Sequence, residues 1–250
     1  MFPYRDDNPT ILTPYTTIGL IAVNALAWVV VQGMGAEPAL SRSVCQLGLI
    51  PGELFQRVAQ GTAVELGPGV SCVIAGTAAW YTPVTSMFLH GGWLHLLGNV
   101  WFLWVFGNNV EDSMGHGRFV AFYLLCGLIA AGAQAFINPA SVIPMVGASG
   151  AISGVMGAYI VLYPRVRVHM LVVLVFFITR ITVPAWMMLG YWFLLQLLGG
   201  IPMLAEESGG VAFWAHAGGF VAGMMLIWLF RNPVLVARRL RVVSPYHAYD

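Results

Sequence analysis

Long apolar stretches constrain this chain more than any other feature of its sequence. A helix needs about 20 apolar residues to cross the roughly 30 Å hydrocarbon core of a bilayer. Stretches close to that length lie at about 16–34, 85–107, 119–137, 184–199 and 211–230. The composition agrees, since 59% of the residues are hydrophobic and only 8% are charged, against roughly 25% charged in a soluble domain. We therefore expect an all-α polytopic membrane protein.

A sixth, shorter span begins at Ser149 and ends before Arg165. The stretch that follows, VHMLVVLVFFI at 168–178, is too short to cross the membrane as a helix, and we expect it to be interfacial or re-entrant. No internal repeat divides the sequence. Residues 1–250 are thus expected to form one six-span domain, with short tails at 1–15 and 231–250.

The arginines predict how these spans are oriented. Six spans place both termini on one side, and an N-terminus inside puts all arginines in the cytoplasm except Arg42 and Arg57. The positive-inside rule therefore favours N-in and C-in. The N-terminus lacks the pattern of a cleaved signal peptide, and the tails are short. These features favour a bacterial inner or plasma membrane as the location.

The charge balance limits the expected partners. A net charge of +1 is too small to indicate a nucleic acid. The lipid bilayer is therefore the main expected partner.

The long connection between the first two spans, at about 35–84, is expected to face outward. Its LIPGELFQRVAQ segment suits an amphipathic helix on the outer surface. Cys45 and Cys72 also lie there, where an oxidising compartment allows a disulfide, although two unpaired buried cysteines fit equally well. The cysteine spacing does not resemble a zinc site, so no metal is expected.

Ser149 and His216 are polar residues inside apolar spans, where each such residue needs a reason. The helix from Ser149 to Tyr163 is about 22 Å long and falls about 8 Å short of spanning, so its outer end is sunk below the surface. His216 lies about six residues, or about 9 Å, into the last span. These counts put the two side chains at one level. For such a serine considered by itself, helix packing is the commoner role.

Small residues on both helices favour a close approach. They recur at helical spacing on one face of each helix: Ser149, Ser153 and Gly157 on one, and His216, Gly219 and Gly223 on the other. Such faces permit the short contact that a hydrogen bond between a serine nucleophile and a histidine base requires.

The second span carries two further polar residues, His95 and Asn99, as i, i+4 neighbours on one face. They lie about three turns below the outer end if that helix begins near Thr85. Both are hydrogen-bond donors, and donors aimed at one point suit the oxyanion of acyl transfer. His90 lies about 140° away around the helix and is assigned a structural role.

The start of the serine helix suits the same chemistry. Free backbone N–H groups and the positive end of the helix dipole favour negative charge there. Gly147 and Gly150 allow the preceding loop and a substrate backbone to come close.

These motifs together resemble those of the rhomboid intramembrane serine proteases. The matching segments, in order, are HGGWLHLLGN, GNNVEDSMGHGRF, GASG and AHAGGFVAG, and the resemblance covers roughly 80–245. It implies a serine endopeptidase with no cofactor, in which Ser149 attacks and His216 transfers the proton. His95, Asn99 and the Ser149 N–H would bind the oxyanion. Substrates of the family are typically single-span membrane proteins.

The resemblance also assigns roles to the region before the last span. The loop around 200–210 and the fifth span look like the cap and the lateral gate of family members. Many rhomboids carry an aromatic residue four positions after the serine, stacked on the histidine, and here that residue is Ser153. Trp214 and Tyr159 are the aromatic residues considered in its place.

Two functions other than proteolysis are compatible with parts of the sequence. The alternative is a catalytically silent rhomboid-like scaffold that binds client transmembrane helices. Such a protein has no need for Ser149 and His216 together with the donors His95 and Asn99. A proton-coupled transporter ranks last, because the sequence lacks the inverted repeat of such folds.

Overall fold

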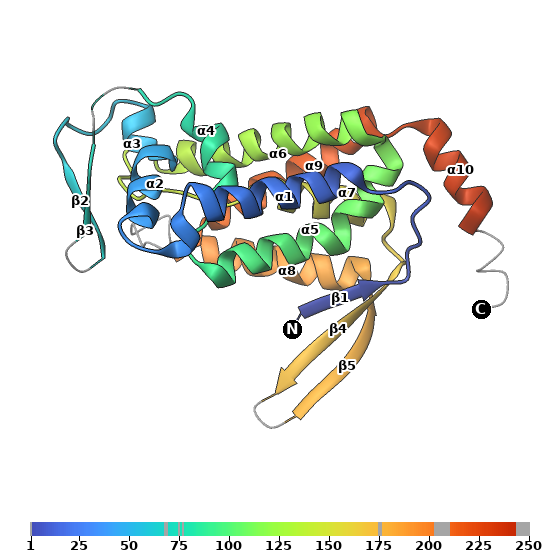
Figure 1. Cartoon of the computed structure of the whole chain (residues 1–250). Coiled ribbons are helices and arrows are strands. Elements are labelled where there is room, and N and C mark those ends of the chain that lie inside the picture. Colours follow the sequence, from blue (N-terminus) through green and yellow to red (C-terminus); the bar gives the residue numbers. More distant parts are fainter. Residues whose placement is uncertain are drawn as a thin grey trace.

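The long helices of the chain run alongside one another in a bundle (Figure 1). The computed structural model describes residues 2–67, 70–74, 76, 78–174, 177–202 and 211–243. The long helices are α1 (Tyr15–Val30), α5 (Trp93–Met114), α6 (His116–Ile137), α7 (Ser149–Leu162), α8 (Ala185–Gly200) and α9 (Phe213–Phe230). By length and composition, α6 and α9 are suited to crossing a membrane, whereas α1, α7 and α8 are shorter apolar helices. The fold is mostly helical, but the expected all-α class is wrong in that two small sheets are also present. The count of six spans stays a prediction.

Helix α7 lies at the centre of the bundle. Every residue from Gly150 to Tyr159 is buried, and the helix packs against α5, α6, α8 and α9. A helix that is apolar all round is stable only in such surroundings. The position of Ser149, the first residue of α7, is therefore fixed by a helix that packs against other helices on several sides.

Backbone contact between α7 and α9 aligns the two helices. A Cβ on Gly219 would overlap the carbonyl oxygen of Gly150, and a Cβ on Gly223 would overlap that of Gly154. The contact on α7 thus runs through Gly150 and Gly154, one position along from the predicted Ser149 and Ser153. It also includes Gly157, as predicted, because a Cβ there would overlap the carbonyl oxygen of Phe220. Glycine is needed there because any side chain would hold the two backbones apart.

Helix α5 begins at Trp93, about eight residues later than the predicted span at 85–107. Before it come the short helix α4 (Thr82–Thr85), a 3-10 turn over Ser86–Phe88 and an extended segment. Gly91 and Gly92 account for the late start, since glycine is a poor helix former. His95 consequently lies in the first turn of its helix, and the predicted depth of three turns is wrong.

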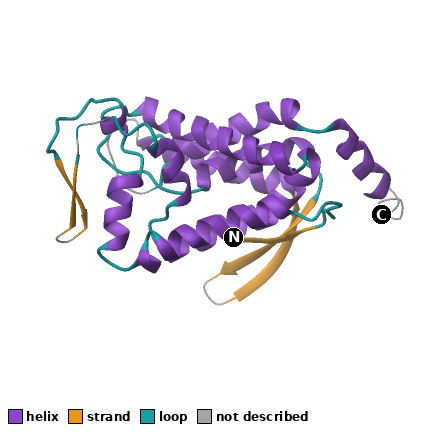
Figure 2. Cartoon of the chain, turned by 45° about the horizontal axis from the view of Figure 1, so that its top comes forward, coloured by secondary structure: helices purple, strands orange, loops and turns teal. Residues whose placement is uncertain are grey.

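The described part of the stretch at 168–178 lies in two paired strands that start near one end of the bundle and project away from it (Figure 2). Strands β4 (Arg167–Leu174) and β5 (Phe177–Pro184) pair antiparallel, and β1 (Phe2–Asp6) adds to the other edge of β4. The expectation of a re-entrant segment is wrong, because the many β-branched residues of both halves favour strands.

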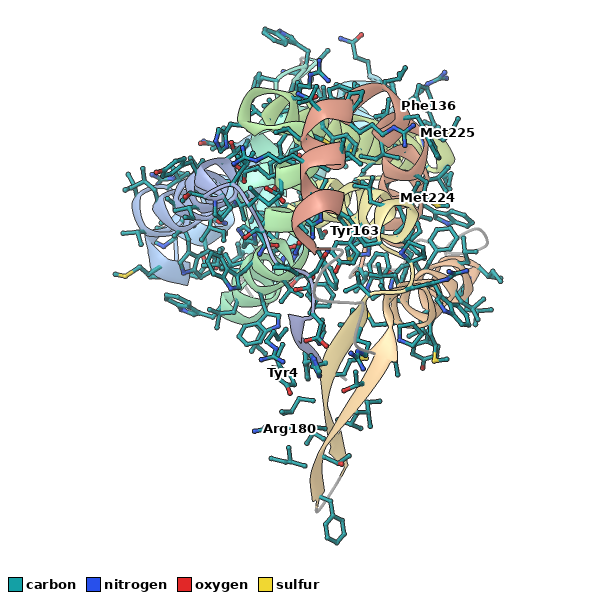
Figure 3. All side chains as sticks on the ribbon, turned by 90° about the vertical axis from the view of Figure 1, so that its right-hand side faces the viewer. Tyr4, Phe136, Tyr163, Arg180, Met224 and Met225 are labelled. Carbon is teal, nitrogen blue, oxygen red and sulfur yellow. A yellow bond between two sulfur atoms is a disulfide. The ribbon has the colours of Figure 1, made fainter. Side chains whose placement is uncertain are left out.

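The three strands are also joined through side chains. Tyr4 of β1 and Arg180, in the middle of β5, lie near one another (Figure 3), and the guanidinium carbon is 5.9 Å from the ring centre. This is within the range of a cation–π contact.

The opposite end of the bundle carries the connection between α1 and α5 (Figure 1). Its elements are the 3-10 turn Gly33–Gly35, α2 (Ala39–Leu47), α3 (Pro51–Leu54), β2 (Ala63–Gly67) and β3 (Val70–Val73). A disulfide joins Cys45 of α2 to Cys72 of β3. The expected amphipathic helix at 49–60 is wrong beyond Leu54, since Gln56 has a positive φ of 53°, which a helix does not tolerate.

Acidic residues near the end of α5 hold both ends of the chain. Glu111 accepts hydrogen bonds from the backbone N–H groups of Thr16 and Thr17 at 2.9 and 2.8 Å, capping the start of α1. Arg239 of the C-terminal helix α10 (Pro233–Val243) binds Asp112 at 2.8 Å. Parts of both predicted tails thus have regular structure packed on the bundle.

Candidate active site

Ser149 and His216 form a hydrogen-bonded pair between α7 and α9. The Ser149 Oγ lies 2.8 Å from Nε2 of His216. Ser149 is the first residue of α7 and His216 the fourth of α9, so both lie where their helices begin. The distance suits proton transfer from a serine hydroxyl to an imidazole base.

The His216 ring is held from helix α8. Its Nδ1 lies 2.9 Å from Oε1 of Gln196, and the ring of Trp192 lies 5.8 Å from the imidazole, centre to centre. Neither aromatic residue expected from the sequence has this role. Trp214 donates to the carbonyl oxygen of Gly200 at 3.1 Å, and Tyr159 bonds Asp6 at the opposite end of α7.

Sequence reasoning missed Gln196 and Trp192, although a signal was present. Gln196 is the one strongly polar side chain in the apolar sequence of α8, and Trp192 precedes it by one helical turn. A polar residue inside such a helix calls for a partner. Ser153 does not reach the histidine and instead donates to the carbonyl oxygen of Ser149 at 2.6 Å.

His95 presents a donor beside the serine. Its Nδ1 accepts a hydrogen bond from the Gly91 N–H at 3.2 Å, which leaves the ring proton on Nε2. A Cβ on Gly147, whose φ is +130°, would lie 2.8 Å from that Nε2 and 3.4 Å from the Ser149 Oγ. Gly147 thus lets the loop before α7 come close to both the imidazole and the serine without filling the space between them.

Asn99 supplies a second donor one turn below His95. It is buried, and its Nδ2 has no hydrogen-bond partner among the described residues. A buried amide donor without a partner is costly, so this group is available to an atom of a bound molecule. The start of α7 adds the Ser149 N–H, which has no acceptor within its own helix.

The remaining predicted residues support this arrangement. His90 is buried and precedes α5. Its backbone N–H and carbonyl oxygen each form a 2.7 Å hydrogen bond with the Gln32 side chain. Its ring packs edge-on against that of His95, with 5.2 Å between the ring centres. Its assigned place on the same helix as His95 is wrong, because α5 begins later. Gly150 faces α6, where a Cβ would lie 2.7 Å from that of Ala130.

A cavity of about 590 Å³ is lined by His95, Asn99, Ser149 and His216, and it is bounded by α5, α6, α7, α8, α9 and the loop before α7. Within the described residues no set of three or more His, Cys, Asp or Glu side chains is placed to hold a metal ion. Most of the predicted cap loop, residues 203–210, lies outside the described residues. The arrangement places a serine hydroxyl, an imidazole and three hydrogen-bond donors beside an open space.

Comparison with known proteins places this chain among a set of related sequences. The family model of the Rhomboid domain matches residues 77–233. Rhomboid-like protein 11, chloroplastic, from Arabidopsis thaliana is 30% identical over 155 residues, which cover 60% of this chain and 52% of that protein. Rhomboid protease GluP from Bacillus subtilis is 38% identical over 97 residues, covering 39% and 18%.

A third relative, Rhomboid protein 1, mitochondrial, from Saccharomyces cerevisiae, is 27% identical over 163 residues, covering 64% of this chain and 44% of that protein. The chain therefore spans about half or less of the length of these three relatives.

Proposed function

Since this chain belongs to the rhomboid family of integral membrane proteins, we propose that it is a serine-type endopeptidase that cleaves transmembrane segments. The observation that carries the proposal is the 2.8 Å hydrogen bond between Ser149 and His216 at the wall of a cavity. Its substrates are single-span membrane proteins, cut near the outer membrane face, with a small residue before the scissile bond.

The geometry supports a two-step acyl transfer. His216 Nε2 takes the hydroxyl proton as the Ser149 Oγ attacks the peptide carbonyl carbon, and the resulting imidazolium returns that proton to the leaving amine. A water molecule then attacks the acyl-enzyme, with His216 again acting as base. No aspartate takes part in this dyad.

The oxyanion of each tetrahedral intermediate is bound by three donors: His95 Nε2–H, Asn99 Nδ2–H and the Ser149 N–H. The beginnings of α5, α7 and α9 meet at the site, so the positive ends of three helix dipoles favour negative charge there. Donors placed in advance at the developing charge are a major source of catalysis.

The site opens on the non-cytoplasmic side in this proposal. The sheet of β1, β4 and β5 and helix α10 lie at the end of the bundle away from the cavity, and they carry most of the arginines. The positive-inside rule assigns that end to the cytoplasm. The membrane is a bacterial inner or plasma membrane, although relatives include chloroplastic and mitochondrial proteins.

The test is cleavage of a labelled single-span substrate in proteoliposomes by the wild type, Ser149→Ala and His216→Ala. We expect cleavage only by the wild type, with thermal unfolding showing that all three proteins are folded. The competing function is a scaffold that binds client helices without cutting them. It is favoured if the folded wild type cuts none of a panel of substrates with small residues near the outer face but retains them in a binding assay.

A further inference from the structure

The imidazole of His216 is held at both nitrogens and across one face. Nε2 faces the Ser149 Oγ at 2.8 Å, and Nδ1 faces Oε1 of Gln196 at 2.9 Å. The ring of Trp192 lies against the imidazole at an interplanar angle of 39°. Serine and histidine come from α7 and α9, whereas Gln196 and Trp192 both come from α8.

The amide of Gln196 is oriented by its own helix. Its Nε2 donates to the carbonyl oxygen of Trp192, one turn earlier, at 3.3 Å. A carbonyl oxygen accepts hydrogen bonds and cannot donate one, so the NH2 group must be on this side of the amide. The acceptor Oε1 is consequently the atom that faces His216.

This orientation selects one tautomer of the histidine. An amide oxygen accepts only, so the imidazole proton lies on Nδ1, and Nε2 keeps its lone pair. Nε2 is the atom next to Ser149, and a lone pair there is what a base needs. The opposite tautomer would place two acceptors 2.9 Å apart and a proton where the serine hydroxyl must donate.

Burial makes the hydrogen bond between Gln196 and His216 important for stability. Gln196 is only 8% exposed, in a helix that is otherwise apolar. A buried amide is costly unless it is hydrogen-bonded, and both ends of this one are satisfied by the bonds described above. Ser153, four residues after Ser149, donates a hydrogen bond to the Ser149 carbonyl oxygen. The contacts to the histidine ring come from α8 instead.

We propose that Gln196, backed by Trp192, is the positioning residue of the dyad: it holds His216 in the Nδ1–H tautomer with Nε2 aimed at Ser149. This inference rests on the proposed proteolytic function. It makes helix α8 part of the catalytic geometry, because a displacement of α8 away from α9 removes both contacts to the ring at once.

The first measurement does not depend on cleavage. Nitrogen-15 NMR of the histidine-labelled protein reports which imidazole nitrogen carries the proton, and the His216 signals are assigned by their loss in His216→Ala. We expect the Nδ1–H tautomer in the wild type and in Leu195→Ala, a control on the neighbouring, 42% exposed position of α8. In Gln196→Leu, which has no acceptor, we expect a mixture of tautomers.

The second measurement separates positioning from folding. For Gln196→Leu we expect kcat to fall by about a hundredfold, the effect of a small misplacement of a catalytic group, with KM within twofold of the wild type. Gln196→Glu keeps an acceptor for Nδ1–H, and its kcat should lie at least tenfold above that of Gln196→Leu. Thermal unfolding checks each variant.

The outcomes distinguish the two proposals. A wild-type tautomer with the proton on Nε2, or a Gln196→Leu variant with unchanged tautomer and kcat, overturns the role of Gln196. If Gln196→Leu does not fold, Gln196→Glu and Trp192→Leu carry the test, and equal loss of kcat in both also overturns it. A wild type that cleaves nothing but shows the Nδ1–H tautomer refutes the proposed function and leaves the positioning contact in place.

Discussion

Replacing Gly147 with alanine tests whether the loop before α7 sets the position of His95. At this residue φ is +130°, a conformation open to glycine and strained for other residues by about 1–3 kcal/mol. The new Cβ would also lie 2.8 Å from Cε1 and Nε2 of His95. Ordinary contact begins near 3.5 Å, so the imidazole would have to move by roughly 0.7 Å.

Such a movement takes the His95 donor out of range of the oxyanion, because donors act over about 2.7–3.1 Å. We expect Gly147→Ala to lower the free energy of unfolding by about 1–3 kcal/mol and to lower kcat by roughly 10²- to 10³-fold, the cost of one oxyanion donor. The assay is cleavage of a single-span substrate in proteoliposomes, with thermal unfolding of the same preparations.

The control is Gly190→Ala, on α8, where a Cβ meets nothing within 4 Å. It should leave cleavage unchanged. A folded Gly147→Ala protein with wild-type kcat would show that His95 does not depend on this loop, and would refute the reasoning.

Three further predictions concern other parts of the molecule. Asn99→Ala removes a donor whose Nδ2 has no partner among the described residues, and should lower turnover by about ten- to a thousandfold while unfolding at the same temperature; unchanged turnover removes Asn99 from the mechanism. Gly223→Ala forces a Cβ onto the Gly154 carbonyl oxygen and should destabilise the protein by about 1–3 kcal/mol, seen as a lower Tm, and a Tm at or above that of the wild type contradicts the close contact. Burial raises the pKa of the Asp6 carboxyl from 3.8 to about 6, so the native state binds the extra proton, and wild-type stability should fall relative to Asp6→Asn by up to about 3 kcal/mol as the pH rises from about 3 to about 7. A difference in Tm between these two proteins that does not change with pH would contradict the last prediction.

The helical character of the chain and its family follow from local features of the sequence. Apolar stretches of the right length predict helices because burial in lipid or protein is the main force on such residues. The motifs around His95, Asn99, Ser149 and His216 stand in a specific order, and membership of the rhomboid family is confirmed by the match over 77–233.

Where apolar character and backbone preference disagree, the predictions were wrong. The second span was expected from about 85, but the Gly91–Gly92 pair delays the helix to Trp93. The stretch at 168–178 is apolar enough for a buried segment, yet its β-branched residues pair with Phe177–Pro184 and with the N-terminal residues Phe2–Asp6. The pairing with Phe2–Asp6 joins segments more than 150 residues apart, which no local pattern reveals.

By itself, the sequence determined which chemical groups are present and that Ser149 and His216 lie near the beginnings of their helices. Helical rise and spacing depend only on the local backbone, so the common level of Ser149 and His216 was predictable. The packing of α8 on α9 decided which side chains contact the histidine. It brings Gln196 and Trp192 to the ring, whereas Trp214 donates a hydrogen bond to the Gly200 carbonyl oxygen. The physical reason is that a hydrogen bond requires positions accurate to a few tenths of an ångström, and such accuracy between helices arises only when their side chains pack together.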